Sequence, residues 1–310
     1  MRILFVGERA FGEKVLRALV TTQNHVVGVC TSPDAAGIPN RVRRAATEFD
    51  IPVVHLENVR KPQFLDECRV LAPELTVMAY VTKILPEDFF TLASIGTIEW
   101  HPSLLPKHGG PNALSWQVIQ GETRAGVTIF WPDGGIDTGP ILLQKEVEIS
   151  PDDTVGSLYN RKIVPMGLEA VLEAVDLVKK GIAPRILQDR SQATYEGMFT
   201  ADHAWVEWCR PAREVFDLIR GANPTPAART YARGQTLRLF DSVLLAEISS
   251  ARPGTITAVM DEGFTVATEG GSILVKQAGQ PGSAPIDAAT ISSQLGLQVG
   301  DVLGLKNTSQ

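Results

Sequence analysis

The chain has 310 residues, of which 44% are hydrophobic and 21% charged, and its formal net charge is −6 at pH 7. This length suggests one large or two ordinary domains with enough apolar material for a core. The negative balance excludes a general positive field that would attract nucleic acid, and three scattered cysteines exclude a disulfide framework or a cysteine-based zinc site.

The amino-terminal segment MRILFVGERAF meets a charged residue soon after its short apolar run. It lacks the longer apolar region and small-residue cleavage site of a signal peptide. No apolar run approaches the roughly 20 residues that a membrane-spanning helix needs. We therefore expect a cytoplasmic protein without membrane contact.

The first third of the chain alternates strand patterns with helical patterns. We predict strands at 2–7, 25–31, 51–55, 74–80 and 93–101, with helices at 13–20, 41–50 and 62–72. Continuous apolar strands separated by helices indicate a parallel sheet covered on both faces. Ligands of such sheets bind beyond the carboxyl ends of the strands, and His101 lies at such an end.

The remaining residues predict two further strands, a long helix and a second domain. The strands cover 126–132 and 139–149, and the helix covers 150–181 with Ser150 or Asp152 as its N-cap. After an extended linker, a helix and short strands separated by turns indicate a small β domain. The predicted fold is α/β: a Rossmann-like, mainly parallel sheet (1–185), a linker (186–205) and a β-rich, barrel-like carboxyl-terminal domain (206–310).

The first strand–helix turn disfavours a dinucleotide site. Its sequence GERAFG does not match G-x-G-x-x-G, and Arg9 and Phe11 would crowd a pyrophosphate. A nicotinamide-dependent oxidoreductase is therefore a poor interpretation of this sheet.

His101 is the sharpest candidate for chemistry. It ends a strand and precedes SLLP, whose proline stiffens the turn, and then the glycine pair of KHGG. The loop DGGIDT supplies Asp133 and Asp137, and one carboxylate reaching the histidine would set its tautomer. Ser103, in the turn beside the histidine, is a further candidate catalytic residue.

Several segments together resemble the folate-dependent formyltransferases. HPSLLPKHGGPNALSW is followed by DTGPILL, whose aspartate lies 36 residues after the histidine. TIFWPDGGIDTGPILLQKEVEISPDDTVGSLYNR, ATYEG and VEWCRPAREVFDLIRG extend the likeness over nearly the whole chain. This family includes the methionyl-tRNA formyltransferases. The resemblance is strongest to the amino-terminal hydrolase domain of 10-formyltetrahydrofolate dehydrogenase.

The resemblance implies transfer of a formyl group from 10-formyltetrahydrofolate as co-substrate, without a metal. It places the formyl group between His101 and Asp137, with the histidine stabilising an oxyanion or passing a proton. It places the pterin against two loop segments of the chain. The expected folate-binding positions there are Met78, Ile84, Leu85, Asp133 and Gly134.

Glu99 departs from the family pattern, which reads Asn-x-His at this place. Strand alternation puts Glu99 and His101 on one face, so the carboxyl group should look into the site. An ionised carboxylate has no proton to donate to an oxyanion. Glu99 is then either protonated, turned away, bound to a cationic acceptor, or paired with a structural partner outside the site.

The formyl acceptor is the open question, and we expect an amine or hydroxylamine of a small molecule, for example hydroxyornithine in siderophore biosynthesis. Water is a second possible acceptor, which would make the protein a 10-formyltetrahydrofolate hydrolase, and methionyl-tRNA is a third. From Ala201 onward there are 9 Lys and Arg against 11 Asp and Glu, a net of −2, which disfavours tRNA. A folate-binding protein with weak or no turnover is also possible, should Glu99 disable the oxyanion site.

Overall fold

The computed structural model describes residues 1–35, 37–38 and 40–304, which form two compact units that interleave along the chain. The first unit contains 1–110, 126–147 and 161–195, and the second contains 111–125, 148–160 and the described residues from 196 onward. The predicted domains were sequential, and residues 305–310 of the last one lie outside the described residues. Segments 111–125 and 148–160 belong to the second unit because they contain α5 (Ala113–Ile119) and α6 (Val155–Leu158), which both pack on α8 (Ala212–Ala222).

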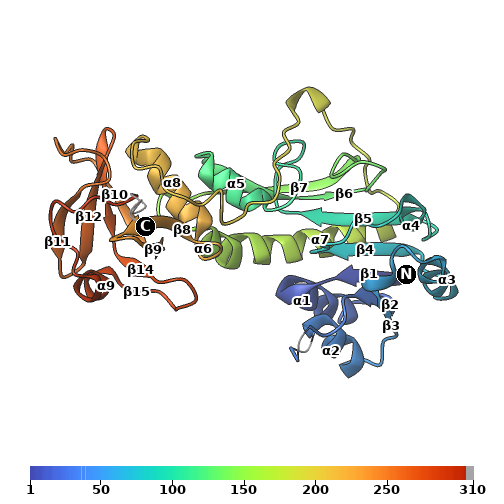
Figure 1. The fold of residues 1–310 in the computed structure, drawn as a ribbon. Helices are drawn as coiled ribbons and strands as arrows, with labels where there is room; N and C mark the ends of the chain where they lie inside the picture. Colours follow the sequence, from blue (N-terminus) through green and yellow to red (C-terminus); the bar gives the residue numbers. More distant parts are fainter. Residues whose placement is uncertain (36, 39, 305–310) are drawn as a thin grey trace. The chain divides into compact units, whose positions relative to one another are not determined.

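The first unit is built on a seven-stranded sheet with the strand order β3-β2-β1-β4-β5-β6-β7 (Figure 1). The pairs among β1 to β5 are parallel, whereas β5 and β6 are antiparallel, which confirms the predicted mainly parallel sheet. The order reverses between β1 and β4, as in doubly wound folds. The strands are β1 (Arg2–Gly7), β2 (His25–Thr31), β3 (Val53–His55), β4 (Leu75–Ala79), β5 (Gly96–His101), β6 (Arg124–Phe130) and β7 (Ile141–Glu148).

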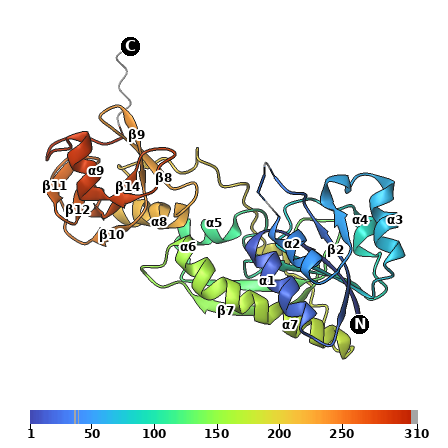
Figure 2. The same ribbon diagram turned by 90° about the horizontal axis from the view of Figure 1, so that it is seen from below.

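Helices cover both faces of this sheet. On one face α1 (Arg9–Val20) and α7 (Val164–Lys179) lie side by side (Figure 2). Gly167 of α7 lets this helix lie close to β5 and α1, because a Cβ there would lie 2.6 Å from Trp100 Nε1 and 3.1 Å from Phe11 Cζ. The other face carries an apolar cluster that includes Met78, Leu85 and Phe89. The remaining helices of the unit are α2 (Arg41–Glu48), η1 (Leu56–Asn58), α3 (Pro62–Val70), α4 (Glu87–Phe90) and η3 (Arg190–Gln192).

The predicted helix over 150–181 is interrupted. Its N-cap is Thr154, whose side chain forms a capping box with Ser157, so the predicted caps at Ser150 and Asp152 are wrong. A π-helical segment (Tyr159–Ile163) follows α6 and leads into α7. Pro165 lies at the start of α7 and has no N–H to donate, which is a sufficient reason for the irregular turn before it.

The second unit contains two four-stranded antiparallel sheets, as the β-rich prediction required. Their orders are β10-β13-β12-β11 and β15-β14-β9-β8. The strands are β8 (Ala228–Ala232), β9 (Gln235–Leu239), β10 (Ser242–Leu245), β11 (Ile256–Met260), β12 (Gly263–Thr268), β13 (Gly271–Val275), β14 (Gln277–Gly279) and β15 (Ile286–Asp287). They pack with α8 and α9 (Ala288–Leu295) around one apolar core. Throughout the described ranges, no helix is both long and apolar enough to cross a membrane.

A buried ion pair lies within α8. Arg220 Nε donates to Asp217 Oδ1 at 2.6 Å, and both side chains are less than 5% exposed. Arg213 Nε donates to the other oxygen of Asp217, and Arg220 also donates to the carbonyl of Asp153. Asp217 therefore supplies a counter-charge at contact distance to a guanidinium that has left water.

We expect Asp217→Ala to lower the free energy of unfolding by about 3–5 kcal/mol, because it removes this carboxylate and leaves the Arg220 guanidinium buried. Glu214→Ala on the same helix removes an exposed ion pair with Arg210 and should cost no more than about 1 kcal/mol. Urea unfolding followed by circular dichroism measures both. Equal losses in the two variants would contradict the assignment.

Candidate active site

Strand β5 brings Glu99 and His101 to one face of the sheet. Glu99 stands opposite Met78 of β4 and Phe130 of β6, and His101 stands opposite Thr128 of β6. Two residues of spacing along a strand put both side chains on the same side. Met78 belongs to the apolar cluster on that side, so Glu99 has apolar neighbours. The Glu99 side chain is half-buried, and the His101 side chain is buried.

The His101 ring is held at both nitrogens. Nε2 lies 2.9 Å from the carbonyl oxygen of His108, and Nδ1 lies 3.5 Å from Asp137 Oδ2. A carbonyl oxygen only accepts, so this hydrogen bond assigns a proton to Nε2. The other ring nitrogen, Nδ1, faces the Asp137 carboxylate.

Hydrogen bonds to the Thr128 side chain fix the turn after β5. Its hydroxyl donates to the Ser103 carbonyl at 2.7 Å and accepts from Leu105 N, while Gln144 Nε2 donates to the Thr128 hydroxyl and to the Leu105 carbonyl. Ser103 is fully buried, and its hydroxyl donates to the Lys107 carbonyl at 2.7 Å. In this arrangement Ser103 shapes the turn that presents the His108 carbonyl, and we propose no catalytic step for it.

Asp137 is placed by its loop rather than by a strand. Its φ of 56° lies in the left-handed region. Its Oδ2 accepts from Gly110 N at 2.7 Å, and Gln188 Nε2 donates to the carbonyls of Asp137 and Gly139 at 2.8 and 2.7 Å. The loop also folds tightly at Gly139, where a Cβ would lie 1.8 Å from the Trp131 carbonyl oxygen. Sequence reasoning missed Gln188, because it lies 51 residues from Asp137 and no local pattern marks it.

The electrostatics of the site depend on Glu99. Burial, and after it the nearby negative charge of Asp137, raise the pKa of Glu99 to about 8. Glu99 is therefore mostly neutral at pH 7 and has a proton to donate. The site thus combines one carboxylate, one imidazole and one neutral carboxyl group.

The predicted folate-binding positions lie on two neighbouring segments. Met78 and Leu85 are buried in the apolar cluster, whereas Ile84 is 81% exposed. Gly134 lies beside α4, where a Cβ would approach Glu87 Oε2 to 3.4 Å. Asp133 stabilises the same loop, because its Oδ1 accepts hydrogen bonds from Gly135 N and from the Thr138 hydroxyl. The segments after β4 and β6 are therefore adjacent.

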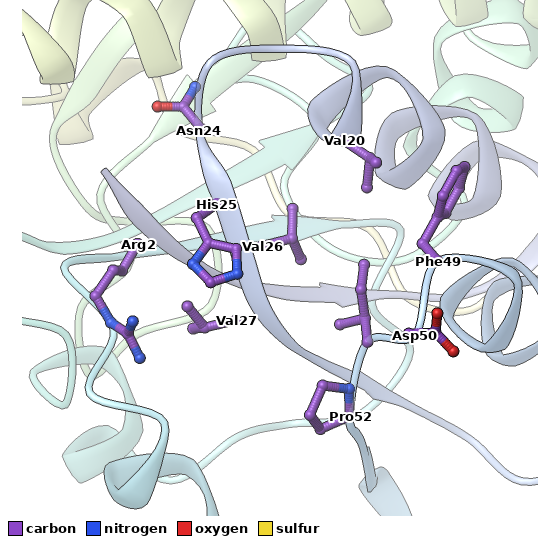
Figure 3. Close-up of a pocket in the computed structure, with 10 residues that line it drawn as sticks. Arg2, Val20, Asn24, His25, Val26, Val27, Phe49, Asp50 and Pro52 are labelled. Carbon is purple, nitrogen blue, oxygen red and sulfur yellow. The ribbon is translucent and has the colours of Figure 1, made fainter.

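Two hollows in the first unit differ in their relation to these groups. The larger, of about 440 Å³, lies at the amino ends of β1 and β2 (Figure 3), and His101 is not among its lining residues. The Arg2 guanidinium on its wall donates to the carbonyls of Leu71 and Ala72. The smaller hollow, of about 140 Å³, has Asp137 in its wall. Its lining is Pro106, Gly109, Ile136, Asp137, Thr138, Gln188, Arg190, Ala193, Thr194 and Tyr195.

Comparison with protein families gives two matches. Residues 1–174 match the family described as formyl transferase, and residues 198–295 match the formyl transferase C-terminal domain. The methionyl-tRNA formyltransferase of Desulfotalea psychrophila is 37% identical over 283 residues, which cover 89% of this chain and 87% of that protein. The cytosolic 10-formyltetrahydrofolate dehydrogenase of Mus musculus is 38% identical over 249 residues. Those residues are 79% of this chain but 28% of the dehydrogenase.

Solved structures share the fold. HypX from Aquifex aeolicus in complex with tetrahydrofolic acid superposes with a TM-score of 0.67 at 18% identity, covering 97% of this chain and 48% of HypX. WlaRD, a sugar 3N-formyl transferase, superposes with a TM-score of 0.70 at 16% identity, covering 92% of this chain and 99% of WlaRD. These identities establish a common fold and no more.

Replacing Asp137 with Asn should lower the pKa of Glu99, because the variant removes the neighbouring negative charge while its amide oxygen still accepts from Gly110. The pKa should stay above its ordinary value, since burial is the larger cause. A ¹³C NMR titration of the glutamate carboxyl groups, assigned with Glu99→Gln, measures it. Asp133→Asn changes the charge of the same loop and is the control; an unchanged Glu99 in Asp137→Asn contradicts the coupling.

Proposed function

The chain belongs to the formyl transferase family, and we propose that it transfers the formyl group of 10-formyltetrahydrofolate to the nitrogen of a small amine or hydroxylamine. The observation that carries this proposal is the His101–Asp137 pair at 3.5 Å, on the face that also holds Glu99. A base, a carboxylate and a neutral donor are what acyl transfer to nitrogen requires.

The residues at hand suit a reduced folate as co-substrate. A pterin is flat and has polar edges, and backbone N–H and C=O groups of the segments after β4 and β6 would hold those edges. Ile84 offers exposed apolar surface beside them. Met78, Leu85, Asp133 and Gly134 would shape the backbone of this site, with the formyl group directed toward His101.

The transfer forms one bond and breaks one. The lone pair of the acceptor nitrogen attacks the formyl carbon, and the carbonyl electrons move to oxygen. When they return, the bond from the formyl carbon to N10 breaks, so the products are the N-formyl acceptor and tetrahydrofolate. His101 Nδ1 takes the proton that the acceptor nitrogen loses, Asp137 stabilises the resulting imidazolium, and that proton ends on N10.

Glu99 supplies the stabilisation of the oxyanion in this scheme. In its neutral form it donates a hydrogen bond toward the formyl oxygen, on the face that it shares with His101. In its ionised form it would place a second carboxylate beside Asp137 and repel the developing negative charge. This assigns the protonated state to the working enzyme.

Methionyl-tRNA is the second candidate acceptor, because a methionyl-tRNA formyltransferase matches this chain over most of both lengths. The charge of the second unit weighs against it. Arg233 pairs with Asp301, and Arg238 donates to the carbonyls of Gln280 and Ser283. These arginines are already engaged, and phosphate contacts depend on positive charge. Hydrolysis, with water as the acceptor, and folate binding with little turnover are less favoured than transfer to a small amine.

Incubation with 10-formyltetrahydrofolate tests the proposal. We expect slow formate release without acceptor, and N-formyl product once a small amine is added, both measured by mass spectrometry. His101→Ala should lower the transfer rate by about 10²–10⁴-fold, whereas His25→Ala, at the exposed start of β2, should leave it unchanged. Fast formate release from folate alone would favour the hydrolase, and formylation of methionyl-tRNA but no small amine would favour the second candidate.

The pH dependence of the wild-type enzyme should show the titration of Glu99. We expect kcat/KM to fall as the pH rises through about 8, where Glu99 ionises. Glu99→Gln keeps an uncharged donor at every pH, so this fall should flatten in the variant. A wild-type rate that rises through the same range, with a rise that Glu99→Gln abolishes, would instead show that the ionised carboxylate is needed, as expected for a group that binds a cationic acceptor.

A further inference from the structure

The smaller hollow has opposite charges on its wall. We propose that it binds the acceptor and that the acceptor is an amino carboxylic acid, with its amine at Asp137 and its carboxylate at Arg190. This rests on the proposed function, and it adds the chemical class of the acceptor and the side chains that select it.

The hollow is preformed by hydrogen bonds between segments distant in the sequence. Thr194 connects to the turn after β5 in three ways. Its N–H donates to the Pro106 carbonyl at 3.2 Å, its carbonyl accepts from Gly109 N at 3.0 Å, and its hydroxyl accepts from His108 N at 2.8 Å. The two hydrogen bonds from Gln188 hold the loop on the opposite side. Little ordering is then needed when a ligand enters.

Asp137 offers one oxygen to the hollow. Its Oδ2 is engaged by Gly110 N and faces His101 Nδ1. Within the described residues, Oδ1 has no hydrogen-bond partner. An ammonium or amine bound there would lie beside the imidazole that takes its proton.

Arg190 provides the positive charge. Its side chain is exposed, and no carboxylate of the described residues lies within ion-pair distance of it. Its neighbour Asp189 is engaged by Ser191 and Gln192. Arg190 lines the hollow, and an unpaired guanidinium matches the planar, bidentate geometry of a carboxylate.

The space between the charges is apolar and small. Ile136 and Tyr195 on its wall are 50% and 59% exposed, so they leave apolar surface for a ligand to cover. A volume of about 140 Å³ is close to that of a cavity that admits one benzene-sized group. An amine, a short hydrocarbon body and a carboxylate together fit this size and this charge pattern.

Four probes with a common body test which terminal group the hollow selects. L-Norvaline and 5-aminopentanoate both become butylamine when their carboxyl group is removed, and 4-aminobutyl phosphate carries a phosphate instead. Calorimetry on the full chain without folate should show the better of the two amino acids binding about tenfold more tightly than butylamine. Arg190→Gln should abolish this preference and leave butylamine binding unchanged.

Arg60→Gln is the matched control, since it removes an exposed guanidinium of the same unit that does not line the hollow. It should retain the full preference. Equal binding of butylamine and both amino acids, an unaltered preference in Arg190→Gln, or tighter binding of the phosphate probe would each overturn the inference.

A separate assay of formyl transfer to the same probes distinguishes this failure from failure of the proposed function. Transfer to butylamine and to the amino acids at equal efficiency would leave small-amine formylation standing without the carboxylate site. Carboxylate-selective binding without any formyl transfer would retain the site and reject the proposed function.

Discussion

The hydrogen bond from His101 Nε2 to the His108 carbonyl is the constraint on which the site depends. It settles the tautomer of the ring and leaves Nδ1 facing Asp137, as the nitrogen that takes up a proton in the proposed transfer. Thr128, Ser103 and Thr194 fix the turn between the two histidines and so hold this carbonyl in place. Polar groups buried under the turn therefore serve the chemistry through position, without touching the reacting atoms.

Glu99 shows how one strand position changes the electrostatics of such a site. The carboxyl group stands in register with Met78 and Phe130, so it loses water, and the charge of Asp137 disfavours its ionisation further. Burial and the charge of Asp137 therefore keep the Glu99 carboxyl group neutral, so that it can donate a hydrogen bond. An amide at this position would donate at any pH, whereas a carboxyl group links donation to the pH of the surroundings.

Short-range rules account for what the sequence could predict. Strand alternation and the apolar strand runs sufficed to predict the mainly parallel sheet and to put Glu99 and His101 on one face. The caps of the long helix were wrong because Thr154 and Ser157 form a capping box that competes with Ser150 and Asp152. Gln188 and Thr194 could not be found, since they act on residues 51 and 86 positions away through hydrogen bonds that no local pattern encodes.

Chemistry and specificity consequently rest on different parts of the first unit. The groups to which the transfer is assigned lie on β5 and on the loop that contains Asp137. This loop folds back against Trp131 at Gly139, where there is no room for a Cβ. In the proposed acceptor site, Arg190 and Tyr195 lie on an exposed segment whose side chains form no ion pair within the described residues. The hydrogen bonds of Thr194 and Gln188 do not involve the Arg190 side chain, so under this proposal a substitution at Arg190 changes the charge of the hollow and not its frame. If the proposal holds, selection among acceptors can therefore change at this segment without disturbing the imidazole or the carboxyl groups to which the transfer is assigned.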